Sequence, residues 1–171
     1  AETRPFIRNK NILPKNLEEY FAYFDMWKKN WNGANLSYEY HFWRHQYYDV
    51  TGTQLAKIIN EDVRSYKLHD VNGIIQDGSQ RSYWPHGLPF YAYAATLFDV
   101  NVNFDELVED YCRHAYGEDW REVAAFFDRL GEVIPQRYVE KTMSKDLSKG
   151  KMYNPEMAPV LRGAKKVLDD F

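Results

Sequence analysis

Hydrophobic residues recur at three- and four-residue steps along most of the chain, which is the pattern of helices that bury one face. The pattern predicts helices over 16–31, 54–68, 88–98, 103–116, 120–134 and from Pro155 onward. Asn16, Asn103 and Asn154 are the predicted amino-terminal caps of three of them, since a short polar side chain can accept from the first free backbone N–H groups. The apolar stripe of the last helix is predicted to comprise Met157, Leu161, Ala164 and Leu168.

A different period, of two residues, runs through 36–43 and predicts a strand. One face would carry Leu36, Tyr38, Tyr40 and Phe42, and the other Ser37, Glu39, His41 and Trp43. A second short strand is predicted over 73–76. The helix 54–68 lies between them, so the two strands should be parallel and joined by a right-handed crossover.

Two parallel strands are rarely a complete sheet, because parallel sheets are normally wider and buried on both faces. This implies either a very small sheet among helices or the end of a larger barrel. We favour the second and expect an α/β fold that is the C-terminal portion of a (β/α) TIM-like barrel with two parallel strands, followed by a mostly α-helical segment. The predicted organisation is a lead-in segment (1–15), a barrel-derived part (16–100) and a helical part packed on it (101–171). These form one structural domain, expected to belong to a longer protein.

Composition excludes several classes of function. The 171 residues carry a net charge of −3 without a clustered basic excess, which argues against nucleic-acid binding. No apolar run approaches the roughly 20 residues that span a bilayer, so no membrane partner is expected. A charged-then-apolar leader is not visible, and we expect a cytoplasmic location, with secretion left open. Aromatic residues are abundant at 17%.

The loops that follow the two predicted strands combine aromatic rings with planar polar groups. Ligands of parallel α/β folds bind beyond the carboxyl ends of the strands, and this mixture of side chains suits a sugar, whose apolar ring faces pack on aromatics while its hydroxyls are hydrogen-bonded. Ordinary anchoring of loops on the core is the alternative. The predicted substrate-binding residues are His41, Trp43, Arg44, His45, Gln76, Gln80, Arg81, Trp84 and His86.

Glu39 and Asp77 are the candidate catalytic carboxylates. Glycoside hydrolysis commonly uses two carboxylates, and neighbouring strands lie about 4.8 Å apart, so these two could approach one another. Within a barrel, the face bearing Glu39 is expected to point into the lumen. The alternative is that each carboxylate pairs with Arg44 or Arg81 to hold the loops. The histidines show no metal-ligand motif, and neither a metal nor another cofactor is expected.

The run Tyr-Glu-Tyr-His at 38–41, the segment 73–81 and Pro-His-Gly-Leu-Pro at 85–89 resemble an uncharacterised bacterial family. Asp-Tyr at 110–111 and Ala-Tyr-Gly at 115–117 resemble a helical segment of the same family. Its members contain a barrel-derived domain similar to the glycoside-hydrolase barrels of hexosaminidases and α-glucuronidases. The resemblance implies a carbohydrate-processing context and a pocket-lining role for the matching positions Glu39, His41, Gln76, Asp77, Gln80 and Arg81.

Two functions follow as expectations. The first is a carbohydrate-active, glycoside-hydrolase-like domain that binds a sugar at its strand-end loops, with a catalytic set that missing strands would complete. The second is a non-catalytic helical accessory module that docks on the remainder of a larger polypeptide or forms a homo-oligomer, because open strand edges and apolar faces invite pairing.

Overall fold

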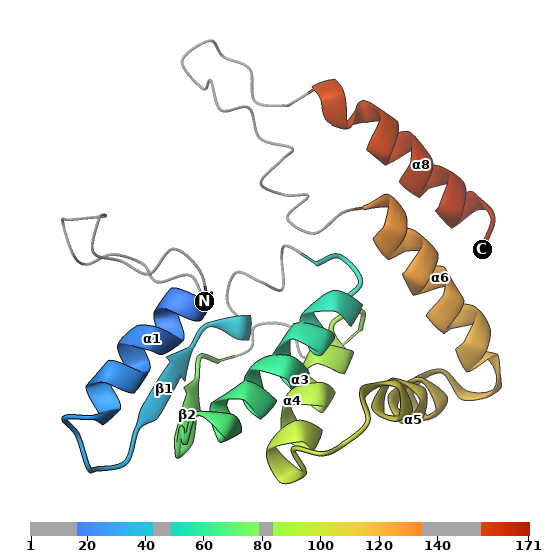
Figure 1. Ribbon diagram of the computed structural model, residues 1–171. Coiled ribbons are helices and arrows are strands. Elements are labelled where there is room, and N and C mark those ends of the chain that lie inside the picture. Colours follow the sequence, from blue (N-terminus) through green and yellow to red (C-terminus); the bar gives the residue numbers. More distant parts are fainter. Residues whose placement is uncertain (1–16, 43–48, 79–83, 135–154) are drawn as a thin grey trace.

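The computed structural model describes residues 17–42, 49–78, 84–134 and 155–171 (Figure 1). These residues form a mixed α/β structure that is mostly helical and contains a two-stranded parallel sheet. In chain order the elements are α1 (Leu17–Lys28), β1 (Leu36–Glu39), α3 (Thr53–Leu68), β2 (Gly73–Gln76), α4 (Gly87–Phe98), α5 (Phe104–Tyr116), η3 (Gly117–Asp119), α6 (Trp120–Val133), η5 (Pro155–Met157) and α8 (Ala158–Asp169). The predicted lead-in segment and the cap Asn16 lie outside the described residues.

The parallel sheet confirms the predicted strand–helix–strand unit. β1 and β2 pair from Leu36 opposite Gly73 to Glu39 opposite Gln76, and α3 is the connection between them. β1 is shorter than predicted, because its hydrogen-bonded neighbour β2 has only four residues. The backbone of His41 and Phe42 forms a π-helical turn instead of continuing the strand.

The covered face of the sheet packs against α3. Phe42 and Ile74 join Leu55, Ile59 and Val63 of α3 in one buried hydrophobic cluster. α1 lies beside β1 (Figure 1). The other face of the sheet is open, with exposed fractions of 63% for Leu36, 55% for Tyr38 and 49% for Ile75.

The helical part continues the core away from the sheet. α3 packs on α4, and Ala56, Leu88, Ala92 and Leu107 form a second cluster that reaches α5. α5 begins as predicted, because the side chain of Asn103 accepts from the backbone N–H groups of Asp105 and Glu106. It ends at Gly117, whose positive φ of 65° favours a residue without a Cβ.

The last helix is rotated from the predicted orientation. Ala164 and Val167 contact α6 in a third cluster around Phe127 and Leu130, whereas Leu161 and Leu168 are exposed. The prediction of the buried face was therefore wrong, because Ala164 and Val167 face α6 in place of Leu161 and Leu168. The predicted cap Asn154 lies outside the described residues. Pro155 starts a 3₁₀ turn, and the α-helix begins at Ala158.

Candidate functional site

The carboxyl ends of the two strands meet at Glu39 and Gln76, as the sequence predicts. These two residues are paired in the sheet, and the side-chain nitrogen of Gln76 donates to the backbone oxygen of Glu39 at 3.1 Å. The backbone N–H of Asp77 donates to the same oxygen at 2.9 Å. Glu39, Gln76 and Asp77 are thus brought together in one small region of backbone.

The carboxylate of Glu39 points toward the helices. Glu39 is 8% exposed, and its Oε1 accepts from the hydroxyl of Tyr66 on α3 at 2.6 Å and from the hydroxyl of Ser37. The expectation that this face of the strand lines a barrel lumen is wrong, because helices cover the outside of a (β/α) barrel and α3 covers this face. Burial and the negative charge of Glu39, together with their hydrogen bond, raise the pKa of Tyr66, which keeps its proton on the shared bond.

His41 lies at the end of the same face and has an acceptor at each ring nitrogen. Nδ1 is 3.1 Å from Oε1 of Gln76, and Nε2 is 2.9 Å from Oδ2 of Asp62. The Gln76 amide cannot be reversed without losing its bond to the Glu39 carbonyl. Both nitrogens must therefore donate, which requires the imidazolium form.

The environment of His41 agrees with a positive charge. Burial lowers the pKa of His41, but the hydrogen bonds to Asp62 and Gln76 and the charges of Glu39 and Asp62 outweigh burial and raise it overall. His41 is only 5% exposed. One buried cation thus lies between two carboxylates, which lowers the free energy of keeping Glu39 away from water.

Asp77 belongs to the opposite side of the sheet from Glu39. Its backbone continues the ladder one residue past Gln76, so alternation places its side chain on the open face with Ile75. Oδ1 accepts from the N–H of Gly78 at 3.0 Å. Oδ2 is buried and has no hydrogen-bond partner within the described part of the chain. Alternation along β2 thus assigns the side chains of Glu39 and Asp77 to opposite faces of the sheet.

Tyrosines occupy the open face next to this end of the sheet. The rings of Tyr38 and Tyr40 lie with centroids 5.1 Å apart, and both residues are exposed. An aromatic surface and a carboxylate thus occupy the same side of the sheet. Such a combination suits the apolar ring face and the hydroxyls of a sugar.

The other predicted site residues lie in different parts of the structure or outside the described residues. Trp84 is exposed and contacts Phe127 on α6, with ring centroids 6.2 Å apart. His86 is buried, and its Nε2 lies 3.0 Å from the backbone oxygen of Asp49, so it anchors the loop before α3. The structure does not describe Trp43, Arg44, His45, Gln80 and Arg81. The described residues contain no group of three or more His, Cys, Asp or Glu side chains placed to hold a metal.

Sequence reasoning missed the partners that α3 supplies. Asp62 and Tyr66 are one turn apart on α3 and contact His41 and Glu39 respectively. A weak signal was present: Asp62 falls three residues after buried Ile59 and beside buried Val63, so it interrupts the apolar face of the helix. A carboxylate at such a position indicates a polar partner on the element that the helix covers.

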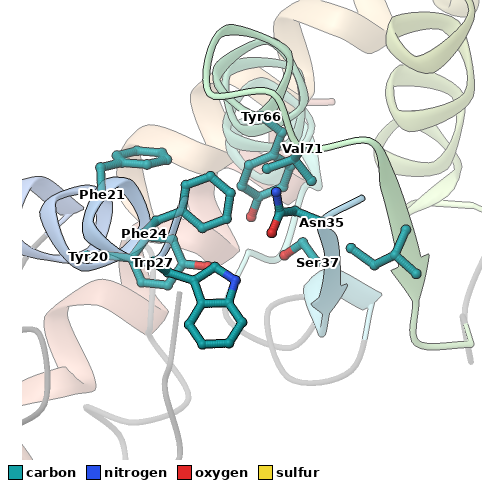
Figure 2. A pocket seen from close by; sticks show the side chains of 9 residues that line it. Tyr20, Phe21, Phe24, Trp27, Asn35, Ser37, Tyr66 and Val71 are labelled. Carbon is teal, nitrogen blue, oxygen red and sulfur yellow. The ribbon is translucent and has the colours of Figure 1, made fainter. Parts of the chain in front are cut away.

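A second feature is a cleft of about 240 Å³ between α1 and the amino-terminal part of β1 (Figure 2). Aromatic side chains from α1 and α3 line much of it, namely Tyr20, Phe21, Phe24, Trp27 and Tyr66. Ser37 of β1 and Asn35, which directly precedes β1, line the opposite side. The cleft is on the covered side of the sheet, away from Asp77.

Comparison with protein-family models, with curated proteins and with solved structures found no match. Among the described helices, none is long and apolar enough to cross a membrane.

Proposed function

We propose that this chain forms part of a carbohydrate-active, glycoside-hydrolase-like protein and binds a sugar at the carboxyl ends of β1 and β2. The supporting observation is the position of Asp77, which follows β2 on the open face of the sheet with a buried, unpartnered Oδ2 among the described residues. Strand ends of parallel α/β folds are where substrates bind.

The open face has the character of the interior of a (β/α) barrel. In such a barrel helices cover the outside of the strands, and bulky side chains fill the inside in layers. Here α3 covers one face, and the other exposes Leu36, Tyr38 and Ile75. We propose that these side chains are the interior layers of a larger barrel, with Asp77 at its substrate end.

In this proposal the carboxylates of Asp77 and Glu39 have different roles. Asp77 is the group proposed to contact the sugar, either as an acid–base group or as a hydrogen-bond acceptor. Glu39 and His41 hold the strand ends from the helix side through Tyr66, Asp62 and Gln76. The second carboxylate that glycoside hydrolysis commonly needs would come from strands elsewhere in the larger protein. Trp43, Arg44, His45, Gln80 and Arg81 follow the strands closely in sequence and remain proposed contributors.

Calorimetric titration with hexosamines, uronic acids and neutral sugars tests this site. Asp77→Asn keeps the size of the side chain and removes its charge. Loss of one hydrogen bond to a charged group is worth about 1.5–3 kcal/mol, so the affinity should fall roughly 10- to 150-fold. Asp99→Asn is the matched control, because Asp99 also accepts a local backbone N–H, from Asn101 at 2.9 Å, and lies after α4. Equal affinities of both variants and wild type for every sugar would refute the assignment of Asp77.

The second candidate function is a non-catalytic accessory module. Exposure of three large apolar side chains on a parallel sheet favours it, because parallel sheets are normally covered on both faces. The proposed occupant of the open face is the remainder of a larger polypeptide, whose strands would extend the sheet.

Solution scattering over a range of concentrations separates the two functions. A docking module predicts association through the open face that Tyr38→Arg abolishes, and no response to any sugar. Tyr23→Arg is the control, since Tyr23 is similarly exposed but belongs to α1 and not to the sheet. A dimer that persists on dilution would identify a second copy as the occupant, and a monomer that binds sugar would favour the first function.

A further inference from the structure

The aromatic cleft between α1 and β1 has a polar end where the hydroxyls of Ser37, Tyr66 and Tyr20 lie. Ser37 and Tyr66 both line the cleft (Figure 2). Both donate their hydroxyl proton to Oε1 of Glu39. A hydroxyl has a single proton, so each oxygen can offer only lone pairs to anything in the cleft. Ser37 and Tyr66 therefore present acceptor oxygens to the cleft, and Tyr20, which also lines it, is hydrogen-bonded to Ser37.

Negative charge lies directly behind these hydroxyls. The carboxylate of Glu39 contacts both of them, and Asp62 lies on the next turn of α3 before Tyr66. The charge of Glu39 raises the pKa of Tyr20 as well, after the larger effect of burial, so its field extends across the cleft to α1. His41 offsets part of this charge, but it contacts Asp62 and Gln76 and does not line the cleft.

The walls of the cleft are rings that attract cations. The faces of aromatic rings are negative, and an ammonium group within about 6 Å of a ring centroid is stabilised. Phe24 already has the ammonium of Lys28 at 6.0 Å from its centroid. Trp27, which binds cations best among the aromatic types, lines the same cleft and is more than half exposed.

We propose that this cleft binds a primary alkylammonium group, with the ammonium at Ser37 and Tyr66 and the alkyl chain against Phe24 and Trp27. Each part of the ligand has a matching surface: N–H donors meet the two acceptor oxygens, the positive charge meets the field of Glu39, and the methylenes meet the rings. A neutral alcohol of the same length lacks the charge that the field of Glu39 attracts. The site is separate from the proposed sugar site, because Asp77 lies on the other face of the sheet.

The test is a titration of the whole chain with n-butylammonium chloride, followed through the indole N–H signals in nitrogen-15 NMR spectra. The chain has five tryptophans, and the Trp27→Phe spectrum assigns the signal of interest. We expect a saturable shift of the Trp27 signal at constant chloride concentration. 1-Butanol should need at least a tenfold higher concentration for the same shift, and glucose should leave the signal in place.

Two variants test the polar end. Glu39→Gln removes the charge and should weaken n-butylammonium binding at least fivefold, while Ser37→Ala removes one acceptor and should weaken it by a smaller factor. Tyr23→Phe on α1 is the control and should bind like wild type, because Tyr23 is exposed and is not among the residues that line the cleft. If Glu39→Gln does not fold, Ser37→Ala still tests the proposal. The chemical shift of the Trp120 indole signal shows whether each variant is folded.

The same group can come from a free amine or from a lysine side chain. Nα-acetyl-lysine methylamide is therefore titrated alongside n-butylammonium, and binding of either supports the proposal, the tighter one identifying the source. Equal responses to n-butylammonium and 1-butanol would overturn it, since the cleft would then be merely apolar. It would be overturned equally by unchanged binding in both Glu39→Gln and Ser37→Ala, or by a shift with glucose alone.

Discussion

The side-chain oxygen of Gln76 lies 3.1 Å from Nδ1 of His41, and Gln76 cannot turn this oxygen away, because its amide nitrogen donates to the carbonyl of Glu39. His41 must therefore donate at Nδ1 while it also donates to Asp62 at Nε2. A neutral imidazole has one N–H and can serve only one of these acceptors. The paired ends of β1 and β2 thus select the protonated form of a buried histidine.

This relationship predicts that part of the stability depends on pH. The pKa of His41 is raised in the folded chain above its unfolded value of about 6.5, so the stabilisation is fully present below that pH. It is lost as the pH rises through the folded pKa. The difference in free energy of unfolding between wild type and His41→Gln should therefore be larger at pH 5.5 than at pH 9, as measured by urea unfolding at each pH.

His114→Gln provides the control for this measurement. His114 is exposed at the end of α5, and its Nδ1 faces only the backbone oxygen and the carboxylate of Asp110. Because this side chain is exposed, its substitution should change the free energy of unfolding by only a small amount. A His41→Gln difference that stays flat across the same range would contradict the imidazolium assignment.

The hydroxyl of Tyr66 should contribute measurably to stability. Tyr66→Phe leaves Glu39 buried with Ser37 as its remaining hydroxyl donor, and loss of a hydrogen bond to a buried charged group costs about 1.5–3 kcal/mol. Urea unfolding at pH 7 measures the change, with Tyr23→Phe as the exposed control. A loss below about 0.5 kcal/mol would mean that water satisfies Glu39 as well as Tyr66 does.

Two adjacent isoleucines on α3 give a matched test of the core. Ile59 is completely buried between the sheet and α4, whereas Ile58 is 38% exposed. Ile59→Ala should lower the free energy of unfolding by about 2–5 kcal/mol, and Ile58→Ala by less than about 1 kcal/mol. Similar losses for the two variants would show that α3 is rotated from the orientation described.

These isoleucines also show how far the sequence determines the fold. Periodicity predicts the range of α3 and the buried positions Leu55, Ile59, Val63 and Tyr66, but it places Ile58 in the core as well. An apolar arc on a helix can be wider than the surface that its neighbours cover. Which edge of the arc is covered depends on how α4 packs, and the sequence of α3 alone does not contain that information. Leu161 and Leu168 on α8 are exposed for the same reason.

The candidate site at the ends of β1 and β2 could be predicted from the sequence to about the same degree as the fold. Alternation correctly groups Ser37 and Glu39 on one face and Tyr38 on the other, and it predicts that Gln76 ends the neighbouring strand. It does not say which face the helices cover. A polar face is normally the exposed one, but here Tyr66 and Asp62 provide its partners from a helix, 27 and 21 residues further along the chain. Such compensation between distant residues is visible only once the chain is folded.

The cap of α5 offers a local test in which sequence and structure agree. Asn103 accepts from two backbone N–H groups at 2.9 and 3.2 Å. Asn103→Ala should cost about 1 kcal/mol of stability, while Asn103→Asp should retain most of it, because aspartate is an equally good cap. Chemical denaturation of the two variants measures this, and an aspartate variant as unstable as the alanine variant would argue against capping as the role of Asn103.

The most direct test of the proposed sugar site is thermal unfolding of the chain alone and with hexosamines, uronic acids and neutral sugars. A ligand at 100 times its dissociation constant adds about 2.7 kcal/mol to the free energy of unfolding. For a chain of this size that corresponds to a rise in Tm of roughly 5–11 °C, at about 2–4 °C per kcal/mol. We expect one sugar class to raise the Tm of wild type by such an amount and to leave Asp77→Asn nearly unshifted. A cooperative transition that no sugar class moves would contradict a self-sufficient sugar site at the ends of β1 and β2.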